Sequence, residues 1–288
     1  MKKGIIIKLI AGQYTIKGED QNTYQLKPLG VFRHRDISPK VGDWVVFDDD
    51  HILEVKPRKN DLSRPPVVNV DQAILIHSAL QPDFSFNLLD RFLILVEAEE
   101  VTPIIVVSKV DLLPQKELEE LKKKLQYYEN YYKVYYSTVH DEKLIEPIKS
   151  VLKDKVSVFA GQTGAGKSSL LNALDISLSL KTGEISKALG RGRHTTRHSE
   201  LLEIHGGLVA DTPGFSKLDF YKVEAEYLQA HYPDFVQRSQ KCRFRGCLHI
   251  KEPHCAVKKA YENNEILASR YENYLLLYDE IQQQKKRY

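Results

Sequence analysis

The chain is poor in cysteine and has no long apolar run, and these two absences exclude whole classes of protein. Cys242, Cys247 and Cys255 are the only cysteines among 288 residues. An odd number near one end does not fit the disulfide framework of a secreted domain. No apolar run reaches the length of a membrane span, and the opening MKKGIIIKLIAGQY is too short and polar for a signal peptide. The sequence therefore predicts a cytoplasmic protein with no membrane partner, and we expect it to be a monomer.

A large net charge is also missing, since the formal charge is +3. Residues 1–65 and residues 221–288 each hold 12 Lys and Arg against 9 Asp and Glu, whereas residues 66–220 hold 18 against 21. Mildly basic flanks suit contact with a phosphate backbone. An ordinary solvated surface explains the same counts, so charge alone does not decide for nucleic acid.

One stretch has the spacing of a phosphate-binding loop. Gly161 to Ser168 reads GxxxxGKS, after a strand-like run and before a helix-like one. In such a loop, backbone N–H groups hold phosphates, Lys167 reaches the terminal phosphates and the Ser168 hydroxyl binds Mg²⁺. The sequence therefore predicts a nucleoside triphosphate site. The residues expected to line it are Gly161, Gln162, Thr163, Gly164, Ala165, Gly166, Lys167, Ser168 and Ser169.

Two further motifs favour GTP over ATP. In the motif DTPG at 211–214, Asp211 can hold Mg²⁺ through water, and Gly214 lets a backbone N–H approach the γ-phosphate. The motif SKVD at 108–111 follows a buried-strand pattern and is close to NKxD. The Asp111 carboxylate would accept two N–H bonds from guanine, whereas adenine would leave it unpaired. The motifs together predict GTP and GDP as the nucleotides.

The order of these motifs is inverted relative to ordinary GTPases, in which the phosphate loop comes first and NKxD follows DxxG. A circular permutation builds the same sheet, because chain termini tend to lie close together at a domain surface. In these motifs and their order, the chain resembles the RsgA family of ribosome small-subunit-dependent GTPases over essentially its whole length. We expect an α/β fold: a circularly permuted P-loop GTPase domain between an N-terminal OB-type β-barrel and a C-terminal α-helical zinc-binding domain.

The domain boundaries follow from changes of pattern. Residues 1–65 contain five short strand patterns that fit an OB-type barrel with an RNA-binding role, and an SH3-like or purely structural barrel is the alternative. The strands are expected at 5–9, 13–16, 23–26, 43–47 and 52–55. Residues 66–220 alternate strand and helix patterns, which implies a mostly parallel sheet with helices on both faces. Residues 221–288 are mainly helical and end in a long helix from about 264 to 286.

The cysteines have the spacing of a metal site. Cys242, Cys247, His249 and Cys255 offer three thiolates and one imidazole within fourteen residues, which matches a closed tetrahedral Zn²⁺ site. His254 is a competing ligand, and the family resemblance favours His249. We expect one structural zinc that stabilises a small domain and has no role in catalysis.

The residue that positions the attacking water is less evident. Phe215 stands where many GTPases have a Gln after DxxG. The Gly- and Arg-rich run 190–197 lies where switch I belongs, and its His194 either polarises the water or contacts RNA phosphates. By resemblance to the family's HTT motif, Thr196 is the Mg²⁺-binding switch residue, with Thr195 as second choice. The expected catalytic residues are His194, Lys167 and Thr196, and the expected Mg²⁺ ligands are Ser168, Thr196 and Asp211.

Two positions depart from the family pattern around the base. Ser108, which precedes Lys109, replaces the usual Asn that bonds the base and braces the phosphate loop. We expect Asp111 to keep guanine specificity and the affinity to fall by about 0.5–1.5 kcal/mol. Ser137-Thr138 stands where the family often has Ser-Ala and where a backbone N–H contacts the guanine carbonyl, so Ser137 completes the expected base site.

The resemblance implies a role in ribosome assembly: binding the small ribosomal subunit and its rRNA late in maturation, with subunit-stimulated GTP hydrolysis coupled to release. Because DTPGF leads straight into the zinc domain, γ-phosphate contacts can reposition an RNA-binding module through a short covalent link. Two other classes stay open. One is a GTP-gated RNA-binding module with incidental hydrolysis, and the other is a signalling GTPase with a protein effector.

Overall fold

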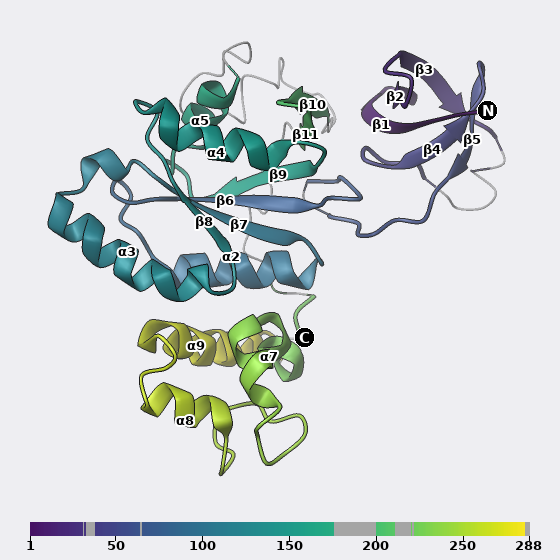
Figure 1. Cartoon of the computed structure of the whole chain (residues 1–288). Coiled ribbons are helices and arrows are strands. Elements are labelled where there is room, and N and C mark those ends of the chain that lie inside the picture. Colours follow the sequence, from purple (N-terminus) through teal and green to yellow (C-terminus); the bar gives the residue numbers. More distant parts are fainter. Residues whose placement is uncertain are drawn as a thin grey trace.

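The computed structural model describes residues 1–30, 32, 38–63, 65–175, 200–210, 220 and 222–285. Figure 1 shows a small barrel at the N-terminal end, a central sheet with helices on both faces, and a helical C-terminal part beneath one of those faces. None of the described helices is both long and apolar enough to cross a membrane.

The N-terminal part is a closed five-stranded barrel with the strand order β1-β2-β3-β5-β4. The parallel pairing of β3 with β5 and the antiparallel pairing of β1 with β4 give the OB topology. The alternation seen in the sequence fills the barrel, because Ile6, Ile16, Phe47 and Ile52 are fully buried. The OB-type barrel is therefore confirmed. Its strands are β1 (Lys2–Ile10), β2 (Gln13–Gly18), β3 (Thr23–Pro28), β4 (Trp44–Phe47) and β5 (His51–Val55).

The central sheet has six strands in the order β10-β11-β9-β6-β7-β8. Its pairs are parallel except for β10 with β11, so the carboxyl ends of β9, β6, β7 and β8 lie at one edge. All seven residues of β6 are buried, as expected for a central strand covered on both faces. The strands are β6 (Gln72–Ser78), β7 (Thr102–Ser108), β8 (Lys133–Tyr136), β9 (Val156–Gly161), β10 (Leu201–Ile204) and β11 (Gly207–Ala210).

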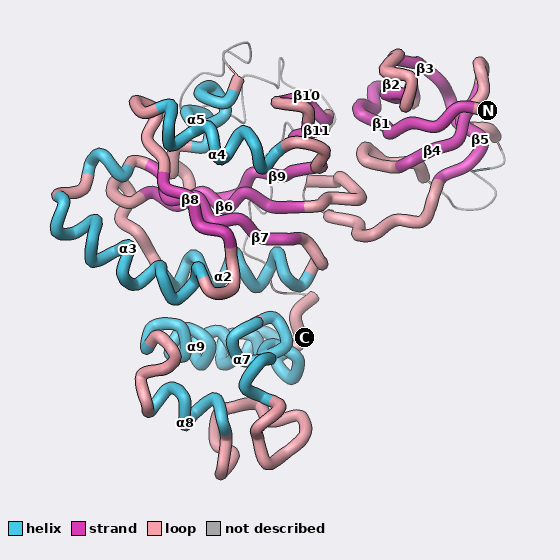
Figure 2. The backbone as a smooth tube through the Cα atoms, in the orientation of Figure 1, coloured by secondary structure: helices cyan, strands magenta, loops and turns pink. Residues whose placement is uncertain are grey.

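Helices cover the two faces of this sheet (Figure 2), and the buried apolar side chains form two separate clusters. Helices α2 (Phe86–Ala98) and α3 (Gln115–Glu129) lie on one face, and α4 (Glu142–Leu152) and α5 (Lys167–Leu174) lie on the other. Alternate residues of β6 divide between the clusters, because Leu75 belongs to the cluster with α2 and Ile76 to the cluster with α4 and α5.

The pairing of β11 with β10 in a hairpin was not predicted from the sequence. Its two-residue turn is His205-Gly206, and both residues have positive φ, as hairpin turns of the primed types require. The hairpin also anchors the barrel. Lys8 of β1 pairs with Glu200 at 2.8 Å, and Lys17 of β2 pairs with Glu203 of β10.

The C-terminal part consists of η3 (Ala225–His231), α7 (Pro233–Ser239), α8 (Ala256–Glu262) and α9 (Ala268–Lys285). The long terminal helix begins at Ala268, four residues later than expected. Asn264, with φ of 58°, ends the turn after α8, so the helix cannot include it. Helix α9 packs against α2 of the central part.

Candidate nucleotide-binding site and metal centre

The phosphate-binding loop joins β9 to α5, as the sequence predicts. Gly161 has φ of 144°, and a Cβ atom there would lie 2.1 Å from the carbonyl oxygen of Ile76 in the neighbouring strand. Only glycine fits so close to that backbone. Gly166 caps α5 with φ of 88°. The loop therefore turns sharply and presents the first N–H groups of α5 to an anion.

Lys167 lies across this loop. Its ammonium group donates to the carbonyl oxygens of Gly161 at 2.7 Å and Gln162 at 2.8 Å. Burial lowers the pKa of Lys167, because a charged ammonium is costly to desolvate. Phosphate oxygens at the loop would restore a full counter-charge to this cation. Ser168 follows in the first turn of α5 and is buried.

The hydroxyl of Ser108 braces the phosphate loop. Ser108 ends β7 and is buried, and its Oγ donates to the carbonyl oxygen of Ala165 at 2.6 Å. The resemblance assigns such bracing to Asn, and the shorter serine performs it here. Because the hydroxyl proton is used on the loop, Ser108 has none left to donate to a base.

Lys109 and Asp111 complete the SKVD turn. Lys109 has φ of 56°, and its ammonium donates to the carbonyl oxygens of Gly164, at 2.7 Å, and Gln81. Lys109 thereby holds three loops together. Asp111 lies in the short helix η1 (Val110–Leu112) and is exposed, so its carboxylate is open to the edge of a base.

The turn after β8 lies next to the SKVD turn. The N–H of Ser137 donates to the carbonyl oxygen of Val107 at 2.8 Å, and the carbonyl oxygen of Ser137 accepts from the N–H of Val110 at 3.4 Å. Since the Ser137 N–H is used within the sheet, the N–H for a guanine carbonyl would come from Thr138 instead. The assignment of the Ser137-Thr138 turn to the base stays a prediction.

Several predicted site residues lie outside the described part of the chain. They are His194, Thr195, Thr196, Asp211, Gly214 and Phe215. Of the expected Mg²⁺ ligands, the structure describes Ser168 alone. The assignments of the switch residues stay predictions.

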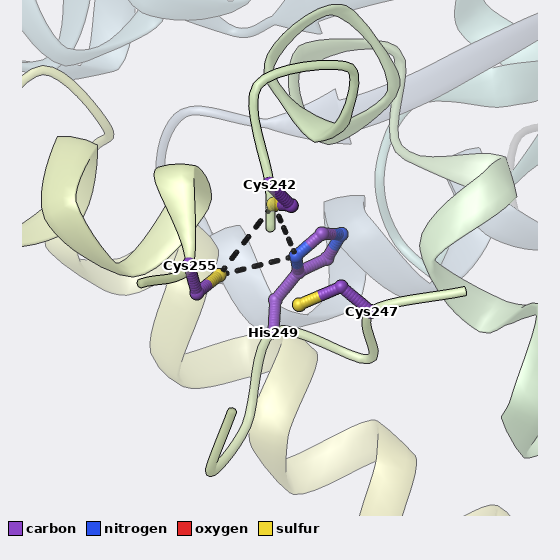
Figure 3. Close-up of side chains that lie close together, drawn as sticks. All are labelled: Cys242, Cys247, His249 and Cys255. Carbon is purple, nitrogen blue, oxygen red and sulfur yellow. Dashed lines mark hydrogen bonds between the residues drawn. The ribbon is translucent and has the colours of Figure 1, made fainter. Parts of the chain in front are cut away.

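The four predicted zinc ligands converge (Figure 3). The ligand atoms of Cys242, Cys247, His249 and Cys255 all lie within 4.8 Å of one another. The Cys242 Sγ lies 3.9 Å from the Cys255 Sγ, and the His249 Nδ1 lies 3.7 and 3.3 Å from these two sulfur atoms. A tetrahedral Zn²⁺ requires edges of about 3.8 Å between sulfurs and about 3.6 Å between sulfur and nitrogen. The cluster therefore fits a structural zinc.

The donor chemistry also fits a cation. Burial raises the pKa of the Cys247 thiol to about 12 and lowers the pKa of His249, so without a cation the thiol stays protonated and the imidazole neutral. Zn²⁺ would bind the thiolate form and the neutral Nδ1. His254, the competing ligand, is exposed and is not part of the cluster.

Side chains around the cluster fix its loop. The Tyr271 hydroxyl donates to the carbonyl oxygen of His249 at 2.6 Å. The Glu252 carboxylate accepts from the N–H groups of Leu248, Ile250 and Lys251 at 2.8 to 3.0 Å. Burial alone would raise the pKa of Glu252, but these donors lower it. The ligand loop is therefore held by polar contacts as well as by the ligands.

Comparison with known proteins agrees with this geometry. The model of the RsgA GTPase family matches residues 55–221, and that of the RsgA N-terminal domain matches residues 3–52. The chain is 51% identical to "Small ribosomal subunit biogenesis GTPase RsgA 2" of Oceanobacillus iheyensis over 294 residues, and 47% identical to "Small ribosomal subunit biogenesis GTPase RsgA" of Bacillus subtilis over 300 residues. Each comparison covers the whole of both chains.

Two solved structures share the fold. YloQ, described as a circularly permuted GTPase, superposes with a TM-score of 0.86 and 42% identity over 99% of this chain and 96% of its own. YjeQ from Thermotoga maritima superposes with a TM-score of 0.87 and 35% identity over 97% of this chain and 98% of its own. The inverted motif order therefore corresponds to a known permuted arrangement.

Two variants separate bracing of the loop from recognition of the base. Ser108→Ala leaves the Ala165 carbonyl unpaired, so GTP and GDP should both bind roughly 2- to 13-fold more weakly, with unchanged preference over ATP. Asp111→Asn should instead reduce the preference for guanine and favour xanthosine triphosphate. Calorimetric titration with the four nucleotides measures both effects. Equal affinity of the wild type for ATP and GTP would contradict the guanine assignment.

Removing one zinc ligand tests the metal centre. Freshly purified protein should contain about one zinc per chain, and Cys247→Ser should lose it, because a closed site needs all four ligands. Proteolysis should then begin in residues 221–288, while GTP affinity stays near the wild-type value. Metal analysis and limited proteolysis measure this, with His254→Ala as the matched control that keeps its zinc.

Proposed function

The chain belongs to the RsgA family of GTPases, and from that membership we propose that it acts in biogenesis of the small ribosomal subunit. In this proposal it binds the subunit and its rRNA late in maturation as a cytoplasmic monomer, and hydrolysis of GTP releases it. The observation that carries the proposal is similarity over the full length to proteins named for this role. A signalling GTPase would not need the accompanying barrel and zinc part, whereas a GTP-gated RNA-binding module with incidental hydrolysis would turn over GTP equally fast with and without small subunits.

The enzyme is a GTP hydrolase that uses GTP and Mg²⁺, as its family implies. When bound, Mg²⁺ neutralises charge on the phosphates. We propose that Ser168, Thr196 and Asp211 hold it and that Lys167 neutralises charge on the terminal phosphates. Ser108 and Lys109 keep the loop in shape, and Asp111 selects guanine. We divide the chain into three domains: the barrel at residues 1–65, the GTPase domain at 66–220 and the zinc-binding domain at 221–288.

We assign the water-positioning role to His194, because Phe215 can neither donate nor accept a hydrogen bond. A neutral imidazole accepts a hydrogen bond from water near pH 7. It would act mainly in the transition state, so it should affect turnover much more than GTP affinity.

Cations without an ion-pair partner among the described residues support direct contact with rRNA, and they lie in residues 241–247, the loop that contains the zinc ligands Cys242 and Cys247. Seven Lys and Arg side chains of residues 1–65 form ion pairs, including Lys2 with Asp49. By contrast, the exposed Lys241, Arg243 and Arg245 form no side-chain ion pair within the residues that the structure describes. Free cations gain more from phosphate contact than neutralised ones.

An aromatic ring lies among these cations. Phe244 is 43% exposed, and the Arg243 guanidinium lies 5.6 Å from its ring centroid. Exposed aromatic and guanidinium planes stack on unpaired bases. Zinc ligands at both ends of the loop, Cys242 and Cys247, hold this arrangement in place. We propose this loop as an rRNA contact.

Co-sedimentation tests the proposed partner. With a non-hydrolysable GTP analogue, the wild type should sediment with small but not large ribosomal subunits. Phe244→Ala with Arg243→Gln and Arg245→Gln should weaken that binding roughly tenfold or more and reduce its salt dependence, because stacking and phosphate contacts are lost. Lys2→Gln, which removes an already paired cation, is the control. Equal sedimentation of wild type and the loop variant would exclude the loop as a contact.

His194→Ala tests the catalytic assignment. Subunit-stimulated turnover should fall by roughly 10²-fold or more at saturating subunit, with GTP affinity nearly unchanged. The variant should also stay bound to the subunit in GTP. Turnover measured against subunit concentration decides the role. If His194 contacts RNA only, the plateau will equal that of the wild type and be reached at higher subunit concentration.

A further inference from the structure

The contact between α2 and α9 contains a fully buried ion pair. Asp90 of α2 and Arg270 of α9 each have 1% of their side chain exposed, and the Arg270 guanidinium donates to the Asp90 carboxylate. That carboxylate also accepts from the Tyr128 hydroxyl at 2.8 Å and from the Asn273 amide at 2.6 Å. Asp90 is therefore bonded to its own domain through Tyr128 and to the C-terminal part through α9.

The other side of Arg270 is bonded within the C-terminal part. Its Nη2 lies 3.3 Å from the Asp234 carboxylate of α7, and its guanidinium lies 4.2 Å from the ring centroid of Tyr232. Tyr127 of α3 donates to Asp234 at 2.7 Å. Buried charges without partners are costly, so this network permits one docked position of the C-terminal part on α2 and α3.

The hydrogen bonds and ion pairs that α2 makes with α9 lie in the first half of α2, which is the half nearer to the nucleotide site. Besides Asp90, Asn87 donates to Asn273 at 3.0 Å, and Arg91 forms two bonds to Glu280 at 2.6 and 2.7 Å. All three residues lie in the first two turns of the helix, after its cap Ser85. The beginning of α2 therefore cannot move without α9.

The loop that leads into α2 lies against the phosphate-binding loop. Lys109 donates to carbonyl oxygens of both loops, those of Gln81 and Gly164. A Cβ atom on Gly164 would lie 3.5 Å from Pro82, which is van der Waals contact. Seven residues separate Pro82 from Asp90. A short, packed path thus runs from the phosphate loop through α2 to the C-terminal part.

We propose that Asp90 and Arg270 are positioning residues for GTP hydrolysis: they make the placement of residues 79–85 against the phosphate loop depend on the position of the C-terminal part. This inference rests on the proposed function, in which that part contacts the small subunit. Fixing the C-terminal part on the subunit would fix α2, and α2 would hold the phosphate loop in its reactive shape. The effect belongs to the subunit-bound state and not to nucleotide binding itself.

The test is Asp90→Asn, which keeps the shape of the side chain and removes its charge. At saturating small subunit, kcat should fall roughly 5-fold or more, the range of a typical coupling between two sites. Basal turnover, GTP affinity, zinc content and half-saturating subunit concentration should stay within about 2-fold of wild type. A purely structural role would lower the amount of folded protein and leave kcat per folded molecule unchanged, which would overturn the proposal.

Glu99→Gln is the matched control. Glu99 follows the last turn of the same helix and pairs with Lys222 at 2.7 Å, so the variant breaks a contact between the same two parts at the end of α2 away from the phosphate loop. It should keep the wild-type plateau. A plateau lowered equally by both variants would contradict a path through the beginning of α2.

A milder variant decides the question if Asp90→Asn does not fold. Asn273→Ala removes one donor to Asp90 and the acceptor of Asn87, and leaves the ion pair with Arg270. It should also lower the kcat measured at saturating small subunit. A kcat equal to that of the wild type, in a folded and zinc-loaded variant, would overturn the proposal. If the wild type is not stimulated by subunits, the proposed function fails. If the wild type is stimulated and the variants match it, only the positioning role fails.

Discussion

The parallel alignment of β9, β6, β7 and β8 is the constraint on which the nucleotide site depends. It places the carboxyl ends of these strands at one edge of the sheet, although their order along the chain is inverted. The bond from the Ser108 hydroxyl to the Ala165 carbonyl then joins the SKVD turn to the phosphate loop. Circular permutation changes the connections between strands and preserves this edge, so the chemistry of a GTPase is retained.

The inverted order of the motifs also changes which part of the chain is connected to the nucleotide site. The sequence suggested one link to the zinc part, the covalent segment after DTPGF. The structure adds a second, because the buried Asp90–Arg270 pair fixes α9 on α2 and Arg91 lies 5.1 Å from the ring centroid of Phe220. A C-terminal part held in this way fits a model in which it and α2 move as one body. The barrel has its own attachment, through Lys8 and Glu200.

Local patterns predicted much of this architecture. Fixed spacing identified the phosphate loop and the zinc ligands, since each is built within a few residues of chain, and alternation identified the barrel strands. The sequence could not predict contacts between distant segments. Asp90 lies off the apolar stripe of its helix, so from the sequence alone it would be placed in solvent, and so would Arg270. Nothing in the sequence around either residue shows that the two bury each other. The resemblance assigned bracing of the phosphate loop to the position of Ser108, but only the structure shows that the shorter hydroxyl still reaches Ala165, 57 residues away.

We propose above all that the small ribosomal subunit activates a permuted guanine site. The most direct measurement is GTP turnover by the wild type alone and with purified small subunits, large subunits or free rRNA, with ATP as the control nucleotide. We expect slow turnover by the protein alone, a rise of roughly tenfold or more with small subunits, and little change with large subunits or free rRNA. Equal stimulation by free rRNA, or equal turnover of ATP, would contradict it.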